Sequence, residues 1–212
     1  MKKIFFIAVV MTQIFLMNFA SAEIIDKPLP WSENRERLTR EYAEMHYGFS
    51  QTEINPQAVV VHWTAGSTWE SAYNIFYDDT LEEDGWVNVS SQFIVDKDGT
   101  ILRLMPENKL ARHAIGYNWC AIGIENVGGV NGVEDLTEAQ LQSNIWLIRY
   151  LREKFPEIKF VFGHYQQVEA RTSGLYIEKV PDYFAGKPDP GKIFMQALKD
   201  ALEGDGFQFF PI

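Results

Sequence analysis

The sequence contains a single cysteine, Cys120, among its 212 residues. One thiol can neither close an intramolecular disulfide nor build a cysteine-based zinc site, so the fold must be stabilised by packing and any metal must be held by other side chains. Basic residues are also few, because 19 Lys and Arg stand against 29 Asp and Glu, which gives a formal net charge of −10. A chain of this charge repels phosphate groups, which argues against nucleic-acid binding.

The sequence also lacks an apolar run of membrane-spanning length. Two lysines precede a mostly apolar stretch from Ile4 to Phe19, and Ala20-Ser21-Ala22 follows with the small residues of a signal-peptidase site. The apolar stretch is shorter than the roughly 20 residues that span a bilayer, so an uncleaved anchor is the weaker alternative. We expect residues 1–22 to be a signal peptide, and the mature chain to be secreted, periplasmic and free of a membrane anchor.

The composition is that of a compact folded domain, with 46% hydrophobic and 23% charged residues. The length fits one domain, since domains usually contain about 100–200 residues. We predict a single domain over residues 23–212, with an N-terminal extension over about residues 23–55 and a C-terminal tail over about residues 204–212.

Strand and helix signals alternate along this domain. A hairpin is predicted around Asp98-Gly99, which is a strong turn signal, and a helix is predicted to begin at the capping box Thr137-Glu138-Ala139-Gln140. The predicted strands cover residues 58–61, 92–95, 101–105, 121–127 and 159–163, and the predicted helices cover residues 33–45, 69–78, 137–155 and 190–202. Interleaved strands and helices that include a hairpin predict an α/β fold with a mixed central β-sheet flanked by helices.

Two of the four histidines, His62 and His164, follow predicted strands that are far apart in the sequence. Ligands of open α/β sheets bind beyond the carboxyl ends of the strands, so the two imidazoles could share one site. Two imidazoles suit zinc, and a catalytic zinc ion typically takes a third protein ligand and leaves one position to water. Without a second cysteine the third ligand should be a carboxylate, but spacing alone does not choose among 29 acidic residues.

Six short segments occur in an order that is specific when they are taken together. They are His62-Trp63-Thr64-Ala65-Gly66, residues 91–99, Ala111-Arg112-His113-Ala114, Ile122-Gly123-Ile124-Glu125, Gly163-His164 and Lys187-Pro188-Asp189-Pro190-Gly191. Together they resemble the zinc-dependent N-acetylmuramoyl-L-alanine amidases of the type-2 family, which share a fold with peptidoglycan recognition proteins. The resemblance covers roughly residues 55–200. It implies a cell-wall hydrolase that cleaves the amide bond between N-acetylmuramic acid and L-alanine in peptidoglycan or muropeptides.

The resemblance also implies a role for individual residues. It implies that His62, His164 and Asp189 bind Zn²⁺. It implies that Glu125 is the general base and acid for attack by a zinc-bound water, and that Lys187 stabilises the oxyanion. These roles fit the chemistry of amide hydrolysis, which needs a nucleophile at neutral pH, a polarised carbonyl and a proton donor for the leaving nitrogen.

Further residues are candidates for contact with the substrate. Trp63 directly follows a metal ligand and is expected to face the substrate, whereas His113 either contacts the substrate or is a structural histidine. Gly123 lies on the same strand face as Glu125 and should leave room there for the substrate. A long insert, residues 165–188, is expected to shape access to the site.

Simpler interpretations of the same residues remain open at this point. Asp189 could cap the final helix, Glu125 could form an ion pair within the sheet, and Lys187 could be a surface charge. The main alternative function is a non-catalytic peptidoglycan-binding module of the same fold, and a structural zinc site would require a fourth protein ligand. The sequence leaves open the choice between intact peptidoglycan and anhydro-muropeptides, the preferred stem peptide and the oligomeric state.

Overall fold

The computed structural model describes residues 23–80 and 85–212, so the expected signal peptide lies outside the described residues. The strands are β1 (Ile24–Asp26), β2 (Ala58–Trp63), β3 (Phe93–Val95), β4 (Ile101–Arg103), β5 (Ala121–Asn126) and β6 (Phe160–Gly163). The α-helices are α1 (Glu33–Tyr47), α2 (Trp69–Tyr77), α3 (Glu138–Lys154) and α4 (Lys192–Ala201), and short 3-10 turns cover Val130–Gly132, His164–Gln166 and Glu169–Ser173. No helix within these described ranges combines the length and apolar character needed to cross a bilayer.

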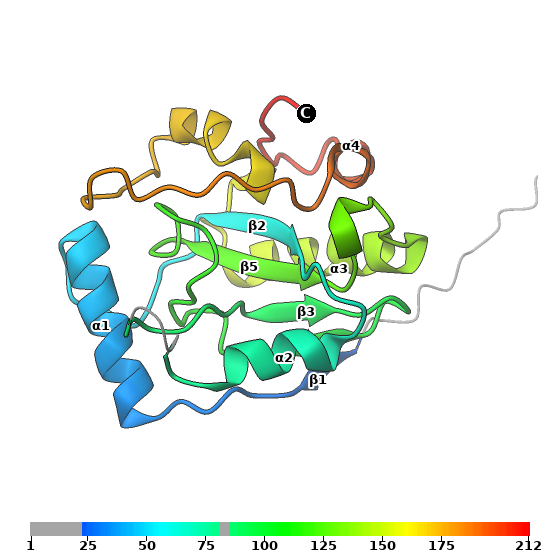
Figure 1. Cartoon of the computed structure of the whole chain (residues 1–212). Coiled ribbons are helices and arrows are strands. Elements are labelled where there is room, and N and C mark those ends of the chain that lie inside the picture. Colours follow the sequence, from blue (N-terminus) through cyan, green and yellow to red (C-terminus); the bar gives the residue numbers. More distant parts are fainter. Residues whose placement is uncertain (1–22, 81–84) are drawn as a thin grey trace, which may run out of the picture.

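The six strands form one mixed sheet in the order β1-β4-β3-β5-β2-β6 (Figure 1). β3 and β4 are antiparallel, whereas β1 is parallel to β4, and β3, β5, β2 and β6 are parallel to one another. The predicted α/β class and the mixed sheet are therefore confirmed. Strand β1 was not predicted, because three residues are too few to show a periodic pattern.

Side chains of the central strands alternate between two layers. The apolar side chains Val59 and Val61 of β2 and Ile122 and Ile124 of β5 belong to the same buried cluster as residues of α3 and α4. The intervening side chains point to the opposite face, where Ala72 and Phe76 of α2 pack against Ile94 and Leu102. In Figure 1, α3 lies behind the sheet and α2 in front of it. The face with α2 also carries His62 and Glu125, so this alternation places both polar side chains on the side of the sheet opposite α3.

Helix starts follow local capping signals, with one exception. At the starts of α1, α2 and α3, a backbone N–H donates to the side chain of the N-cap residue, which is Ser32, Thr68 or Thr137 respectively. The predicted start of the last helix at Pro190 was wrong, because α4 begins at Lys192. Gly191 precedes it with φ of 90°, outside the helical region, so the helix cannot extend back to Pro190.

A buried arginine joins α1 to the end of α2. The Arg35 side chain is 1% exposed, and its Nη2 donates to the carbonyl oxygens of Phe76, Tyr77 and Asp78 at 2.9, 2.9 and 2.7 Å. Its Nε lies 3.2 Å from Oδ1 of Asp79. Carbonyl groups at the end of a helix have no partner within the helix and carry partial negative charge, so this cation satisfies and stabilises them.

Replacing Arg35 with alanine should lower the free energy of unfolding by about 3 kcal/mol, because buried carbonyls and a carboxylate lose their partner. Arg37→Ala is a matched control, since Arg37 lies on the exposed side of the same helix and pairs with Glu41. Exposed pairs of this spacing contribute about 0.3–0.5 kcal/mol. Denaturant unfolding followed by circular dichroism measures both losses, and equal losses would contradict the role assigned to Arg35.

Candidate metal centre and its pocket

Three side chains from distant parts of the sequence converge at one edge of the sheet. His62 lies near the carboxyl end of β2, and His164 directly follows β6. Because β2 and β6 are parallel neighbours, their carboxyl ends bring both imidazoles to the same edge. The third residue, Asp189, lies three residues before α4, and the N–H of Tyr165 donates to its carbonyl oxygen at 2.9 Å. This backbone hydrogen bond holds the segment before α4 next to the end of β6.

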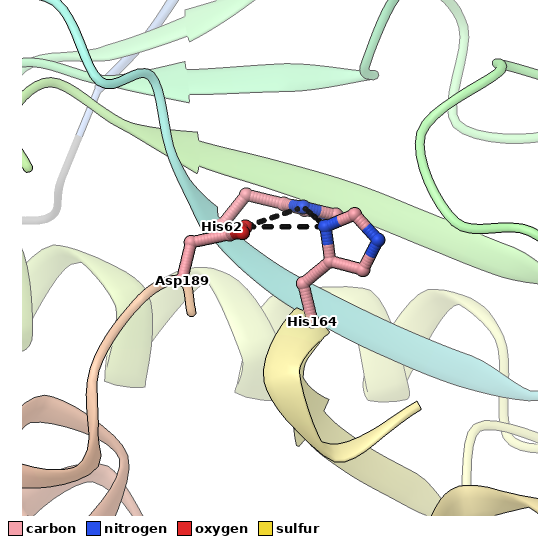
Figure 2. Close-up of side chains that lie close together, drawn as sticks. All are labelled: His62, His164 and Asp189. Carbon is pink, nitrogen blue, oxygen red and sulfur yellow. Dashed lines mark hydrogen bonds and ion pairs between the residues drawn. The ribbon is translucent and has the colours of Figure 1, made fainter. Parts of the chain in front are cut away.

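The three side chains meet in a tight triangle (Figure 2). Nδ1 of His62 lies 3.0 Å from Nδ1 of His164 and 3.1 Å from Oδ2 of Asp189, and the third side of the triangle, from His164 Nδ1 to Asp189 Oδ2, is 3.2 Å. All three residues are buried. The two nitrogens cannot both donate to Asp189 and also bond to each other, whereas a cation shared by the three atoms satisfies all of them. The group is therefore compatible with a metal site.

The ionisation states of these residues also suit a metal. Burial and the neighbouring His164 lower the pKa of His62 to about 4, although Asp189 acts in the opposite direction. Burial alone would raise the pKa of Asp189, but contacts with His164 and His62 outweigh it and hold this pKa below its usual range. At neutral pH His62 is neutral and Asp189 is ionised, and these are the forms that bind metal ions.

Glu125 lies beside the triangle on the adjacent strand. β5 pairs with β2 in a register that places Glu125 opposite His62, so both side chains leave the sheet on the same face. Its Oε2 is buried without a hydrogen-bond partner. Among the described residues Glu125 forms no ion pair, so the interpretation of Glu125 as half of an ion pair within the sheet was wrong. Burial and the charge of Asp189 raise the pKa of Glu125 well above its usual range, and Lys187 acts against this. The carboxyl group is thus free to exchange a proton with a molecule in the pocket.

The triangle and Glu125 line a pocket of about 670 Å³. Its walls come from residues 62–65 at and just beyond the carboxyl end of β2, from residues 112–115, and from residues between Tyr183 and Asp189. Lys187 is exposed at this pocket, and its charge affects the pKa values of both His62 and Glu125. The insert of residues 165–188 therefore contributes one wall of the pocket next to His62, His164 and Asp189.

The structure bears on two expectations about the lining, Trp63 and Gly123, and contradicts the second. Trp63 lies at the pocket but is only 7% exposed, and its indole packs against Gly129, where an added Cβ would lie 2.2 Å from a ring atom. Most of the Trp63 side chain thus packs within the protein, and the part that lines the pocket keeps Trp63 a candidate for contact with the substrate. The prediction that Gly123 leaves room for the substrate was wrong, because an added Cβ there would lie 2.8 Å from the ring of His113. His113 itself lines the pocket and fills the space above Gly123.

Asp189 does not cap α4. The N-cap residue is Gly191, which forms no side-chain hydrogen bond, and the N–H of Ile193 donates to Oε2 of Glu134 at 2.9 Å. The interpretation of Asp189 as a helix cap was therefore wrong. Its side chain is directed at the two histidines instead.

The end of the pocket away from the triangle includes residues that sequence reasoning missed. Tyr42 of α1 and Asn118 line it, and Nδ2 of Asn118 donates to the hydroxyl of Tyr42 at 3.1 Å. The guanidinium of Arg112 lies 5.4 Å from the centre of the Tyr42 ring and donates to the hydroxyl of Tyr183 at 3.0 Å. In the sequence Tyr42 shows only helical apolar spacing, which does not separate a core residue from a pocket residue.

Comparison with known proteins places the chain among cell-wall enzymes. Residues 52–192 match the profile of a family described as N-acetylmuramoyl-L-alanine amidase. The endolysin of Escherichia phage T7 is 32% identical over 111 residues, which are 50% of this chain and 73% of the relative. The endolysin of Enterobacteria phage T3 is 36% identical over 103 residues, which are 47% of this chain and 68% of the relative.

Solved structures agree with the sequence relatives. The N-acetylmuramoyl-L-alanine amidase LysC from Clostridium intestinale is 26% identical, with a TM-score of 0.55 over 85% of this chain and 97% of that chain. Bumblebee PGRP-SA, at 18% identity, has a TM-score of 0.57 over 90% of this chain and 98% of that chain. The second likeness shows the fold alone, and together they confirm the predicted fold class.

Replacing Asp189 with alanine should weaken divalent-metal binding by at least about 100-fold, because loss of a direct ligand should exceed the 10–100-fold effect of losing an outer-shell partner. Competition with a chromophoric chelator measures the affinity. Asp200→Ala is the control, since Asp200 is exposed on α4, away from the triangle. Unchanged affinity in Asp189→Ala would show that the metal binds elsewhere.

Proposed function

This chain belongs to the N-acetylmuramoyl-L-alanine amidase family and is an amidase of that class, and on that premise we propose that it is a secreted zinc hydrolase. It cleaves the amide bond between N-acetylmuramic acid and L-alanine in peptidoglycan or muropeptides. The observation that carries this proposal is the convergence of His62, His164 and Asp189 beside the unpartnered carboxyl group of Glu125.

The donor atoms support zinc as the metal. Two imidazole nitrogens and one carboxylate oxygen are a usual set for catalytic zinc, which keeps a fourth position open. The three donor atoms are 3.0, 3.1 and 3.2 Å apart, close enough for one zinc ion to be held by all of them. Within the described residues this metal-binding group has three members and no fourth, which favours a catalytic over a structural zinc site.

Glu125 performs the proton transfers that amide hydrolysis needs. Zinc, when bound, polarises the scissile carbonyl and lowers the pKa of a coordinated water toward about 7. The Glu125 carboxylate accepts a proton from the attacking water and returns it to the nitrogen of L-alanine as the C–N bond breaks. Protonation of that nitrogen is required because an amide anion is a poor leaving group. The raised pKa of Glu125 suits the second transfer, and a bound cation would offset it for the first.

Lys187 supplies positive charge on the wall of the same pocket. When water adds to the carbonyl carbon, negative charge develops on the carbonyl oxygen, and a fixed ammonium group nearby stabilises it. Lys187 also lowers the pKa of Glu125, which favours the ionised form that acts as a base. One cation therefore assists two stages of the reaction.

Export is part of the proposal and rests on the first 22 residues. Their basic start, apolar stretch and Ala20-Ser21-Ala22 ending form the pattern of a cleaved signal peptide. Export across the cytoplasmic membrane would bring the mature enzyme into the compartment that contains peptidoglycan.

Glu125→Gln should lower kcat by about 10²–10⁴-fold, because the amide has the shape of the carboxyl group but cannot exchange the proton. Metal content and the circular dichroism spectrum should not change. Chromatography and mass spectrometry of the peptide released from a muropeptide measure turnover, with Glu138→Gln on the exposed start of α3 as the control. Turnover of Glu125→Gln at the wild-type rate would refute the assigned role. Tight muropeptide binding by the wild type without any product would instead indicate a binding module.

Lys187→Met should lower kcat by about 10²–10³-fold through loss of oxyanion stabilisation. The same change should raise the pKa of Glu125, because Lys187 lowers it, so the acidic limb of the pH–rate profile should move to higher pH. Lys192→Met, at the exposed start of α4, should alter neither property. An unchanged kcat together with an unmoved acidic limb would show that Lys187 is only a surface charge.

A further inference from the structure

A chain of close contacts leads from the metal centre back into the sheet. His62 uses Nδ1 in the triangle, and its other ring nitrogen, Nε2, lies 3.1 Å from Nδ1 of His113. Nε2 of His113 in turn lies 3.2 Å from the carbonyl oxygen of Ala121 in β5. The two imidazole rings are perpendicular, with centroids 5.1 Å apart. His62, His113 and the carbonyl group of Ala121 thus form one line of contacts that leads away from the triangle.

The chemistry of these groups fixes the position of each proton. A carbonyl oxygen only accepts hydrogen bonds, so Nε2 of His113 must carry a proton and donate it to Ala121. In a neutral imidazole the remaining nitrogen, Nδ1, is then an acceptor. A neutral His62 that offers its Nδ1 lone pair to a metal ion carries its own proton on Nε2. The only consistent direction of donation is therefore from His62 to His113 and from His113 to Ala121.

We propose that His113 is a positioning residue for the metal centre, which holds His62 in the tautomer and orientation that direct Nδ1 at the metal ion. Histidine ligands commonly donate their second ring N–H to a carboxylate, a backbone carbonyl or a water, and this contact orients the ring and raises its basicity. Here a second imidazole takes that place and passes the contact on to the sheet. The inference rests on the proposed metal site and adds a residue that does not touch the metal.

The surroundings of His113 lock its ring in place. The ring lies above Gly123, where any side chain would collide with it, since even an added Cβ would lie 2.8 Å from a ring carbon. Its backbone is also fixed, because Oδ1 of Asn118 accepts hydrogen bonds from the N–H groups of His113 and Ala114 at 2.8 and 2.6 Å. Gly123 therefore makes room for a protein side chain that supports the site.

This arrangement leaves His113 little capacity for a polar contact with the substrate. One ring nitrogen accepts from His62 and the other donates to Ala121, so neither is free for a further hydrogen bond. A substrate-binding role would require one of these contacts to break. Positioning and substrate binding therefore predict different effects when the ring nitrogens are removed.

The test compares His113→Phe with His113→Asn in the mature protein after removal of metal. Phenylalanine keeps a planar ring but has no acceptor, whereas Oδ1 of asparagine can take the place of Nδ1. Zinc affinity, measured by competition with a chromophoric chelator, does not depend on turnover. It should fall by about 10–100-fold in His113→Phe and stay close to the wild-type value in His113→Asn. The absorption bands of the Co²⁺-loaded proteins should differ from the wild type only in His113→Phe.

Wild-type zinc affinity in His113→Phe would overturn the inference, as would equal losses in both variants at an unchanged midpoint of denaturant unfolding. If phenylalanine prevents folding, His113→Leu removes the same acceptor with a smaller side chain and must show the same loss. A wild-type protein that binds no zinc would refute the metal site itself and this inference with it. Zinc binding that withstands the loss of the acceptor refutes only the role of His113.

Discussion

The register between β2 and its two parallel neighbours determines where His62, Glu125 and His164 lie. In this register Glu125 is opposite His62, and Gly163, the residue before His164, is opposite Val61. A shift of one residue would turn Glu125 toward the face that packs on α3, because side chains alternate along a strand. The buried apolar residues at alternate positions oppose such a shift, since it would move them out of the core. Core packing on one face of the sheet therefore fixes the positions of His62 and Glu125 on the other face.

Electrostatics explain why these groups tolerate close contact away from water. Two imidazoles and a carboxylate at about 3 Å leave at least one unfavourable contact, which a shared cation removes. The same burial raises the pKa of Glu125 and lowers that of His62, so the two neighbouring groups differ in proton affinity, as the roles proposed for them require. In the positioning role proposed above, His113 contributes through hydrogen-bond direction and not through charge.

Local patterns predicted the fold and the two strand-end histidines, because a buried β-branched run, a capping box and an Asp-Gly turn act over a few residues. The choice of Asp189 required the resemblance to a family, because its place beside the histidines depends on tertiary contacts such as that between Tyr165 N–H and its carbonyl oxygen. Gly123 shows the same limit: the sequence indicated an empty space on the strand, but only packing shows that His113 fills it. The start of α4 was misplaced because Pro190 suits a first helical position, whereas the backbone conformation of Gly191, with φ of 90°, stops the helix from extending back to it.

The candidate metal centre and the far end of the pocket come from different parts of the chain. The insert crosses the top of the molecule toward α1 (orange in Figure 1), and a buried contact between His46 Nδ1 and Glu178 Oε1, 2.9 Å long, joins the two. The rings of Tyr183 and His46 pack together with their centroids 4.4 Å apart. The hydroxyl of Tyr183 accepts a hydrogen bond from Arg112, so the contacts between the insert and α1 continue into the pocket wall. Apart from Arg112, the residues described at the end of the pocket away from the triangle, Tyr42, Asn118 and Tyr183, lie outside the family motifs. Strand ends place His62, Glu125 and His164, while α1 and the insert shape the space in front of them.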